Sequence, residues 1–129
     1  MKIRGMHPAD ENFILATMLR GVGHYGLFRE MEPSAFFSNY EPIVKRLLQT
    51  CDVRILCLDA EPGDEDVIIG YCIFSGDVLH YLYVKKAWRG QGLSKKLLQG
   101  LQPKYTSHLT SDGMWYKLKL QLEYNPWKL

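Results

Sequence analysis

The sequence predicts an α/β (α+β) fold in which a mixed, mainly antiparallel and twisted sheet is flanked by helices. Residues 67–74 and 78–84 are nearly continuous apolar runs separated by a turn, which is typical of neighbouring buried strands. Two stretches before them and one after them carry apolar residues at helical spacing. Because 129 residues can bury an ordinary core, we expect a single domain over residues 1–129.

The first half of the chain predicts one short strand and two helices. Residues 2–4 fit a first strand, and a helix from about residue 10 to residue 20 begins beside acidic side chains and is stopped by Gly21. Residues 21–26 are rich in glycine, and we expect a mobile loop there. A second helix fits residues 38–50, where apolar and charged side chains occupy opposite sides.

Three strands are predicted in the middle of the chain. The first covers residues 53–58, and an acidic turn at residues 61–66 leads to the second at residues 67–74, which we expect to be buried on both faces. Residues 75–77 have the composition of a tight turn. The third strand, at residues 78–84, should therefore return antiparallel beside the second.

The last third predicts a helix, a strand and a shortened C-terminus. Leucines recur at helical spacing over about residues 91–101, and Pro103 ends that helix. A strand is expected over residues 105–110. In the tail, residues 111–116 fit a brief helical turn, and the alternation of apolar and polar side chains over residues 118–124 predicts a final strand.

Charge is distributed unevenly along the chain. The formal net charge of +2 argues against a nucleic-acid partner without excluding one. Residues 85–104 contain no acidic side chain, whereas residues 59–66 form an acidic loop. The basic side chains of the first segment are Lys85, Lys86, Arg89, Lys95, Lys96 and Lys104. This separation favours a localised anionic ligand over a nucleic-acid backbone.

Cysteine usage and the N-terminus predict a cytoplasmic protein. Cys51, Cys57 and Cys72 lack metal-ligand spacing and have mostly apolar neighbours, so we interpret them as reduced core residues. No other group of residues has metal spacing, and no metal is expected. The N-terminus lacks the apolar stretch of a signal peptide, and no run approaches the ~20 apolar residues of a membrane span.

The most informative local pattern is the change from strand to helix near residue 90. An apolar strand ends at Val84, and a basic turn with glycines opens into the next helix. Backbone N–H groups at a helix start have no partner within the helix, and glycines let a ligand approach them, so this pattern suits a diphosphate. The candidate binding residues are Arg89, Gly90, Gln91, Gly92, Leu93, Ser94 and Lys95. A plain tight connection is the alternative interpretation.

Residues 89–94, Arg-Gly-Gln-Gly-Leu-Ser, resemble the Q/R-x-x-G-x-G/A signature of the GNAT superfamily of N-acetyltransferases. Ser94 departs from the signature, which usually has glycine or alanine there. Residues 78–84 resemble the fourth strand of the family, and the likeness extends over about residues 53–110. The resemblance implies a GNAT-like sheet and a turn that grips the pyrophosphate of acetyl-coenzyme A (acetyl-CoA).

The same resemblance implies how the rest of the cofactor is held. In this family the fourth and fifth strands splay apart, and the pantetheine arm of the cofactor hydrogen-bonds in the gap like a further strand. Leu82, Tyr83 and Val84 correspond to the residues along this arm. Their amides would also polarise the thioester carbonyl.

The resemblance also suggests catalytic side chains. Some arylalkylamine N-acetyltransferases carry a histidine on the fourth strand, as this chain does at His80. An ordinary histidine pKa of about 6.5 suits removal of a proton from an amine, although His80 could equally be a packed strand residue. Members of the superfamily often use a tyrosine as the acid for the departing thiolate. Tyr116 is the nearest match, and Tyr124 is the second.

The acceptor side is expected in one of two places. His24 and Tyr25 lie in the glycine-rich loop, and GNAT members commonly admit the acceptor between this region and the splayed strands. His108 on the predicted fifth strand and Ser111 near its end are the other candidates.

These patterns together predict an N-acetyltransferase that moves an acetyl group from acetyl-CoA to a primary amine, as a monomer or a homodimer. The small size and the tail resemble acyltransferase-like proteins encoded by bacteriophages, for which the compartment would be the host cytoplasm. Two alternatives remain open. One is a non-catalytic module that binds CoA or a protein partner, and the other is a phage enzyme that acylates a nucleobase.

Overall fold

The predicted mixed sheet is the centre of the structure. A computed structural model describes residues 1–24, 26–59, 66–108 and 119–129. The six-stranded sheet follows chain order from edge to edge. Its strands are β1 (Lys2–Gly5), β2 (Asp52–Leu58), β3 (Val67–Ser75), β4 (Val78–Val84), β5 (Tyr105–Thr106) and β6 (Glu123–Tyr124). Neighbours from β1 to β4 are antiparallel, whereas β5 runs parallel to both β4 and β6.

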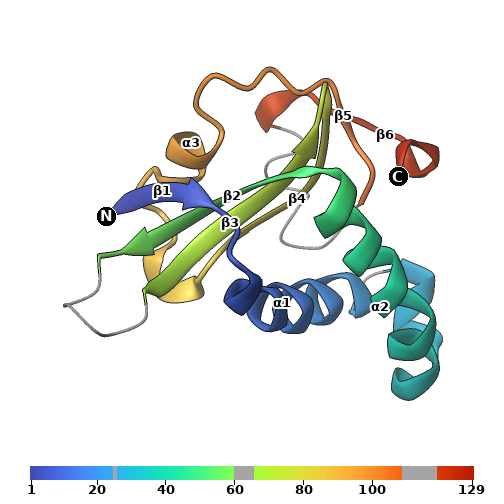
Figure 1. Cartoon of the computed structure of the whole chain (residues 1–129). Coiled ribbons are helices and arrows are strands. Elements are labelled where there is room, and N and C mark those ends of the chain that lie inside the picture. The colour runs from blue at the N-terminus through green and yellow to red at the C-terminus, as the bar shows by residue number, and fades with distance from the viewer. Residues whose placement is uncertain (25, 60–65, 109–118) are drawn as a thin grey trace.

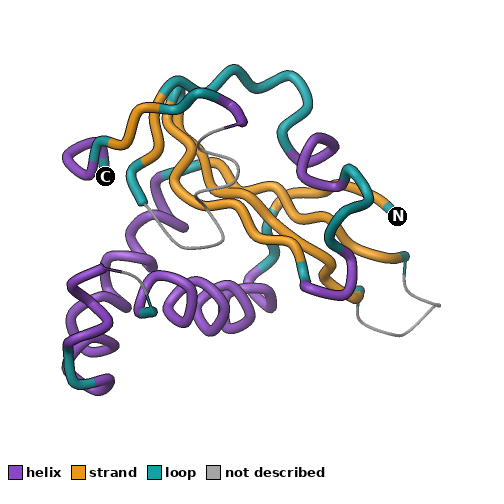
Figure 2. Tube along the Cα trace, turned by 180° about the vertical axis from the view of Figure 1, so that it is seen from behind, coloured by secondary structure: helices purple, strands orange, loops and turns teal. Residues whose placement is uncertain are grey.

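Helices cover both faces of this sheet (Figures 1 and 2). They are α1 (Glu11–Gly23), α2 (Pro33–Thr50) and α3 (Leu93–Leu97), with 3-10 turns η1 (Pro8–Asp10), η2 (Gly26–Glu30), η3 (Lys86–Trp88) and η4 (Pro126–Lys128). Figure 1 shows α1 and α2 together on one side of the sheet and α3 on the other. Two buried clusters result. One packs under α1 and α2, and the other lies beneath α3.

The central strands confirm the prediction from the sequence. β2, β3 and β4 lie within one residue of the expected bounds at each end. Residues 68–73 of β3 are all buried, as expected for a strand covered on both faces. The turn between β3 and β4 contains Gly76 at φ +56°, a conformation that glycine adopts without strain. Cys57 and Cys72 are fully buried, whereas Cys51 is half-buried.

The glycine-rich segment after residue 20 corrects the prediction. Helix α1 continues through Gly21 to Gly23 instead of stopping, so these two glycines are not part of a loop. A Cβ at Gly21 would lie 2.0 Å from the hydroxyl oxygen of Tyr81, and a Cβ at Gly23 would lie 2.9 Å from the ring of Phe36. The glycines are therefore explained by close packing of α1 against β4 and α2.

Helix α2 starts five residues earlier than the predicted residue 38, at Pro33. The side chain of Glu32 accepts a hydrogen bond from the backbone N–H of Ala35 (3.0 Å), and proline is favoured at the first helical position. Its buried residues Phe36, Tyr40 and Val44 recur every four positions. The extra turn thereby carries an aromatic face toward α1 and the sheet.

The C-terminal third differs most from the prediction. The predicted helix over residues 91–101 is only the five-residue α3, and Gly100 has φ +80°. Residues 107 and 108 lie outside the two-residue β5, and the predicted strand over 118–124 is reduced to β6, because Lys119 and Leu120 are helical and Gln121 has φ +56°. Residues 109–118, which include the predicted helical turn, lie outside the described residues.

Candidate active site at the fork of β4 and β5

The described part of β5 stays beside β4 for only two residues. Parallel pairing joins Val78 to Tyr105 and Leu79 to Thr106. From residue 80 onwards β4 keeps β3 on one side, but no described residue forms a strand on its other side. Within the described residues, the β5-facing edge of residues 80–84 therefore has no strand partner.

Backbone groups of β4 point toward this open edge. Lys85 donates its backbone N–H to the carbonyl of Ile69 (2.8 Å), and positions bonded to the neighbouring strand alternate along an antiparallel ladder. By this alternation the N–H and C=O groups of Leu82 and Val84 face away from β3. The carbonyl of Val84 accepts a hydrogen bond from Nε of Arg89 (2.8 Å), which agrees with that direction.

A β-bulge determines where the His80 side chain lies. The pairing of β3 with β4 shifts by one residue there, which leaves His80 as an extra residue in β4. Strict alternation would place His80 on the α3 side of the sheet with Leu82. Instead, Nδ1 of His80 lies 2.6 Å from the hydroxyl oxygen of Ser107, one residue after β5. The bulge thus holds His80 at the point where the two strands separate.

Four buried side chains form a hydrogen-bonded chain behind this point. The hydroxyl oxygen of Ser107 lies 2.6 Å from Nδ1 of His80 and 2.9 Å from Nδ1 of His108. Nε2 of His108 is hydrogen-bonded to the hydroxyl of Tyr40 on α2. All four residues are buried. We refer to them as the histidine chain.

The histidine chain is electrically neutral at pH 7. Burial lowers the pKa of His80, and burial together with the neighbouring His80 lowers the pKa of His108 to about 4. Burial is also the main reason that the pKa of Tyr40 is raised. Within the described ranges, no Asp, Glu, Lys or Arg side chain forms an ion pair or hydrogen bond with these residues.

The glycine turn lies beyond the end of β4. Gly90 and Gly92 have φ of +82° and +77°, values that side-chain-bearing residues rarely adopt. A Cβ at either position would meet no atom within 4 Å, so the space beside both glycines is open. In the part of the chain that the structure describes, the N–H groups of residues 90–92 donate to no backbone carbonyl. The turn therefore presents amide donors that an anion could use.

The shortness of α3 changes the physical basis of such a site. A five-residue helix sums fewer peptide dipoles than the predicted eleven-residue helix would, so its dipole contributes less. Lys95 and Lys96 are exposed beside the turn, whereas Leu93 and Ser94 are half-buried. Half-buried Trp88 packs against the cluster beneath α3. Binding of an anion would depend mainly on loop amides and basic side chains.

The remaining predicted site residues are not gathered in one place. His108 belongs to the histidine chain, but His24 is an exposed residue at the C-terminal cap of α1. Tyr124 is on β6, which β5 separates from β4. Three further candidates, Tyr25, Ser111 and Tyr116, lie outside the described residues.

Two members of the histidine chain were not predicted from the sequence. Ser107 has no signature of its own and becomes significant only because it follows the end of β5. Tyr40 lies 68 positions before His108. The available signal was its four-residue spacing from Phe36 and Val44, which predicts burial but gives no hydrogen-bond partner.

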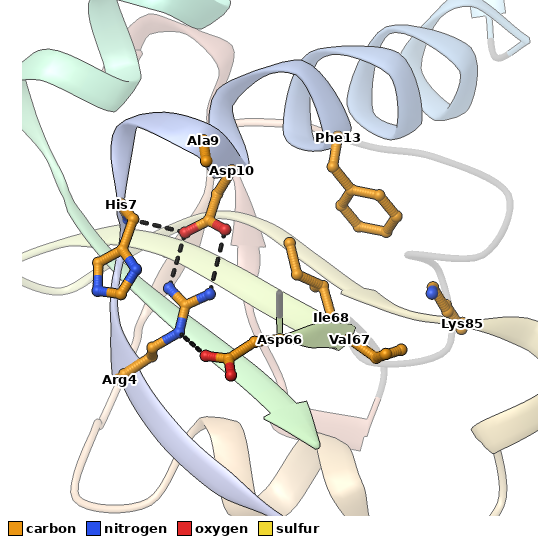
Figure 3. A pocket seen from close by; sticks show the side chains of 9 residues that line it. All are labelled: Arg4, His7, Ala9, Asp10, Phe13, Asp66, Val67, Ile68 and Lys85. Atoms are coloured by element: carbon orange, nitrogen blue, oxygen red, sulfur yellow. Dashed lines mark hydrogen bonds and ion pairs between the residues drawn. The ribbon is translucent and has the colours of Figure 1, made fainter. Parts of the chain in front are cut away.

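A second polar cluster lines a cavity of about 490 Å³ near the start of the chain (Figure 3). Arg4 donates hydrogen bonds to both carboxylate oxygens of Asp10 (2.7 and 3.1 Å) and to Asp66 (3.0 Å). We call these three residues the Arg4 cluster. On another wall of the cavity, the Lys85 ammonium lies 5.3 Å from the centre of the Phe13 ring.

Charges in the Arg4 cluster are fixed. Burial alone would raise the pKa of Asp10, but the hydrogen bonds from Arg4 and from the backbone N–H of His7 outweigh burial and lower it. The pKa of Asp66 is lowered, mainly by its hydrogen bond with Arg4. Since these groups satisfy one another, the cluster is suited to joining β1, α1 and β3.

Two kinds of feature are absent from the described segments. In residues 1–24, 26–59, 66–108 and 119–129, no three or more His, Cys, Asp or Glu side chains come together as a metal site. Over the same residues, none of the helices has the length and apolar character needed to cross a membrane.

Comparison with known proteins gives one family. The model of the acetyltransferase (GNAT) family matches residues 25–123. No curated protein sequence matches the chain.

Solved structures with a similar fold include three bacterial proteins. The apo form of YjaB from Escherichia coli has a TM-score of 0.50 and 18% identity, and the match covers 75% of this chain and 60% of YjaB. An acetyltransferase from Vibrio fischeri has a TM-score of 0.50 and 18% identity, and the match covers 94% of this chain and 87% of the Vibrio fischeri chain. The structure of yncA from Salmonella typhimurium with its cofactor acetyl-CoA has a TM-score of 0.47 and 26% identity. The match covers 79% of this chain and 61% of yncA.

The first and third of these matches cover about 60% of the longer bacterial chains. At these identities the two structures with a TM-score of 0.50 are evidence for the fold alone.

Proposed function

The chain belongs to the acetyltransferase (GNAT) family, and from this premise we propose that it transfers an acetyl group from acetyl-CoA to a primary amine. The observation that carries the proposal is the fork of β4 and β5. A buried histidine, a strand edge without a described partner and a glycine turn with available amides follow one another along residues 80–92. Members of this family use acetyl-CoA, and these features match the parts of that molecule in order.

The residues of the turn fit a diphosphate. The N–H groups of Gly90, Gln91 and Gly92 are without backbone acceptors in the described chain, and the open space beside the two glycines admits phosphate oxygens. Each charge-assisted hydrogen bond contributes about 1.5–3 kcal/mol. Arg89 and Lys95 supply positive charge at the rim. In this proposal residues 89–94 hold the diphosphate of acetyl-CoA.

The open edge of β4 fits an extended, hydrogen-bonding arm. Leu82 and Val84 direct backbone groups away from β3, and the Val84 carbonyl already serves Arg89. The N–H and C=O of Leu82 and the N–H of Val84 are therefore the groups we assign to the pantetheine arm. Tyr83, which the sequence also suggested, would contribute its side chain, because by the same alternation its backbone groups face β3.

His80 is the residue we assign as the general base. When acetyl-CoA is bound, its thioester supplies the activated acetyl group. His80 is neutral at pH 7 because burial lowers its pKa, and no described group pairs with its Nε2. A neutral imidazole nitrogen at the fork can accept the proton of an attacking amine. Tyr116 remains the proposed acid for the thiolate.

The binding step is tested by calorimetry with acetyl-CoA. Wild-type protein should bind, and Gly92→Asp should abolish binding through steric block and charge repulsion. Gly100→Asp is the matched control, because Gly100 also has positive φ (+80°) and open space beside it but lies outside the turn. Tight binding by Gly92→Asp, or equal loss in both variants, would remove the diphosphate assignment.

A turnover measurement distinguishes an enzyme from a non-catalytic module. If acetyl-CoA binds as proposed but no primary amine in a broad panel stimulates release of the CoA thiol, the module interpretation is favoured. Nothing in the described residues favours a nucleobase as acceptor over other amines.

A further inference from the structure

The histidine chain contains one more proton than it has internal hydrogen bonds. With both histidines neutral, His80 and His108 carry one N–H each, and Ser107 and Tyr40 carry one O–H each. Three hydrogen bonds join the four side chains. Each bond uses one proton, so one proton remains, and it lies at one end of the chain whenever Ser107 both donates and accepts within it.

Two arrangements in which Ser107 both donates and accepts satisfy every hydrogen bond. A third, in which Ser107 accepts from both histidines, directs the Ser107 O–H away from the chain and transmits no proton along it. In the first, His80 donates Nδ1–H to Ser107, Ser107 donates to His108, and His108 donates Nε2–H to Tyr40. Nε2 of His80 is then bare and basic, and the Tyr40 O–H points out of the chain. In the second arrangement every bond is reversed, and Nε2 of His80 carries the remaining proton.

Within the described residues, no charge-assisted hydrogen bond reaches the histidine chain. No charged side chain of the described residues forms an ion pair or hydrogen bond with the histidine chain, so none of these interactions fixes a proton at one end. His80 comes from β4, Ser107 and His108 follow β5, and Tyr40 comes from α2. Residues from three separate elements thus form one continuous path between the fork and α2.

We propose that Ser107, His108 and Tyr40 act as a proton relay behind His80, and this inference rests on the function proposed above. They are positioning residues, because they act on the reaction through His80. The relay determines whether Nε2 of His80 is a base or an acid, and it connects that nitrogen to the Tyr40 end of the chain.

The relay balances the protons of acetyl transfer. A neutral amine forms its N–C bond and gives one proton to Nε2 of His80. Nδ1 of His80 passes its proton to Ser107, Ser107 passes its own to His108, and His108 passes its Nε2 proton to Tyr40, whose original proton passes to water. The C–S bond breaks, and the departing sulfur takes its proton from the acid proposed above. Tyr40 then takes a proton back from water, and the reverse shift passes the His80 Nε2 proton to that acid, so both groups are restored. The amine loses one proton and the thiol gains one.

Tyr40→Phe tests the relay without depending on acetyl transfer. This change removes only the hydroxyl and keeps the ring that stacks on Phe36. Imidazole ¹⁵N spectra report the tautomer and the pKa of each histidine, and the chain has only 4 histidines to assign. We expect Tyr40→Phe to change the tautomer balance of His80 and to move its pKa by ~0.5 or more. Tyr71→Phe is the matched control, because it removes a buried hydroxyl bonded to Thr17, outside the histidine chain.

Kinetic measurements then test whether the effect of Tyr40 on His80 influences acetyl transfer. In wild-type background Tyr40→Phe should lower kcat about tenfold and change the pH profile, with the KM for acetyl-CoA unchanged. In a His80→Ala background it should cause no further loss. Unchanged His80 spectra in Tyr40→Phe would overturn the relay whether or not the protein is an enzyme. Coupled spectra in a protein that transfers acetyl to no amine would overturn the proposed function and with it the catalytic role of the relay.

Discussion

The Arg4 cluster and the histidine chain are two polar clusters built on one sheet in opposite ways. In the Arg4 cluster, opposite charges face one another at 2.7–3.1 Å, and the hydrogen bonds outweigh the cost of burial. In the histidine chain there is no charge to pair, and burial itself keeps the groups neutral. One cluster therefore holds charges in place, whereas the other consists of neutral groups, which exchange protons in the relay proposed above.

This difference indicates which cluster is suited to chemistry. Charges that satisfy one another are costly to separate, and their natural use is to hold segments together. The Arg4 cluster does this for β1, the start of α1 and the residue before β3. A neutral histidine has an unprotonated ring nitrogen that can accept a proton, and a general base requires that property.

The largest stability effect is expected from breaking the Arg4 cluster. Asp10→Ala leaves the guanidinium of Arg4, whose side chain is only 14% exposed, without its bidentate partner, and removes the acceptor for the His7 N–H. We expect a loss of about 3 kcal/mol in the free energy of unfolding, measured by urea denaturation. A loss below ~1 kcal/mol would mean that the cluster does not join these segments.

The contributions of the two clusters to stability should change over separate pH ranges. The lowered pKa of His108 means that the unfolded chain takes up its proton first as pH falls, so stability is present above about pH 6.5 and decreases toward about pH 4. Asp10 and Asp66 have lowered pKa values, so their contribution persists above about pH 4 and is lost only below it.

Between pH 7 and pH 5 we therefore expect only the histidine chain to change the free energy of unfolding. Protonation of His108 should lower this free energy by about 2 kcal/mol. His108→Gln should flatten this part of the curve, and Asp10→Ala should leave its slope unchanged. Replacing exposed His24 by Gln is the control for a histidine outside the chain. A slope that survives His108→Gln and disappears in Asp10→Ala would reverse the roles of the two clusters.

The smallest effect is expected at a surface ion pair that belongs to neither cluster. Lys45 and Glu41 pair on one face of α2 at 3.4 Å, but their side chains are 48% and 44% exposed. Solvent screens such a pair, so Lys45→Ala should cost no more than about 0.5 kcal/mol. A loss as large as that of Asp10→Ala would contradict the idea that burial distinguishes the Arg4 cluster.

The sequence predicted the elements whose patterns are local. β2, β3 and β4 have periodicities and turn residues that depend on a few neighbours, and their bounds agree with the structure. Gly21 and Gly23 were interpreted as loop residues because a glycine usually weakens a helix by about 1 kcal/mol. Here the approach of Tyr81 and Phe36 requires them, and that requirement comes from tertiary packing.

The candidate site was predicted only in part for the same reason. The glycine turn was predicted from residues adjacent in sequence, and His80 was predicted from a family resemblance. The direction of His80 depends on a bulge, which the alternation of residues 78–84 does not indicate. The partnership of Tyr40 with His108 depends on the packing of α2 against the end of β5. Long-range contacts of this kind leave no spacing to detect.

The most direct test of this account is an acetyl-transfer assay on wild-type protein and His80→Ala. Acetyl-CoA is supplied with a panel of primary amines, and release of the CoA thiol is followed. We predict that wild type consumes acetyl-CoA with at least one amine. His80→Ala should be about 10²–10⁴-fold slower while binding acetyl-CoA within about threefold of wild type, because the proposed diphosphate turn lies elsewhere. A wild-type protein that binds acetyl-CoA but transfers to no amine, or a His80→Ala protein that transfers as fast as wild type, would contradict it.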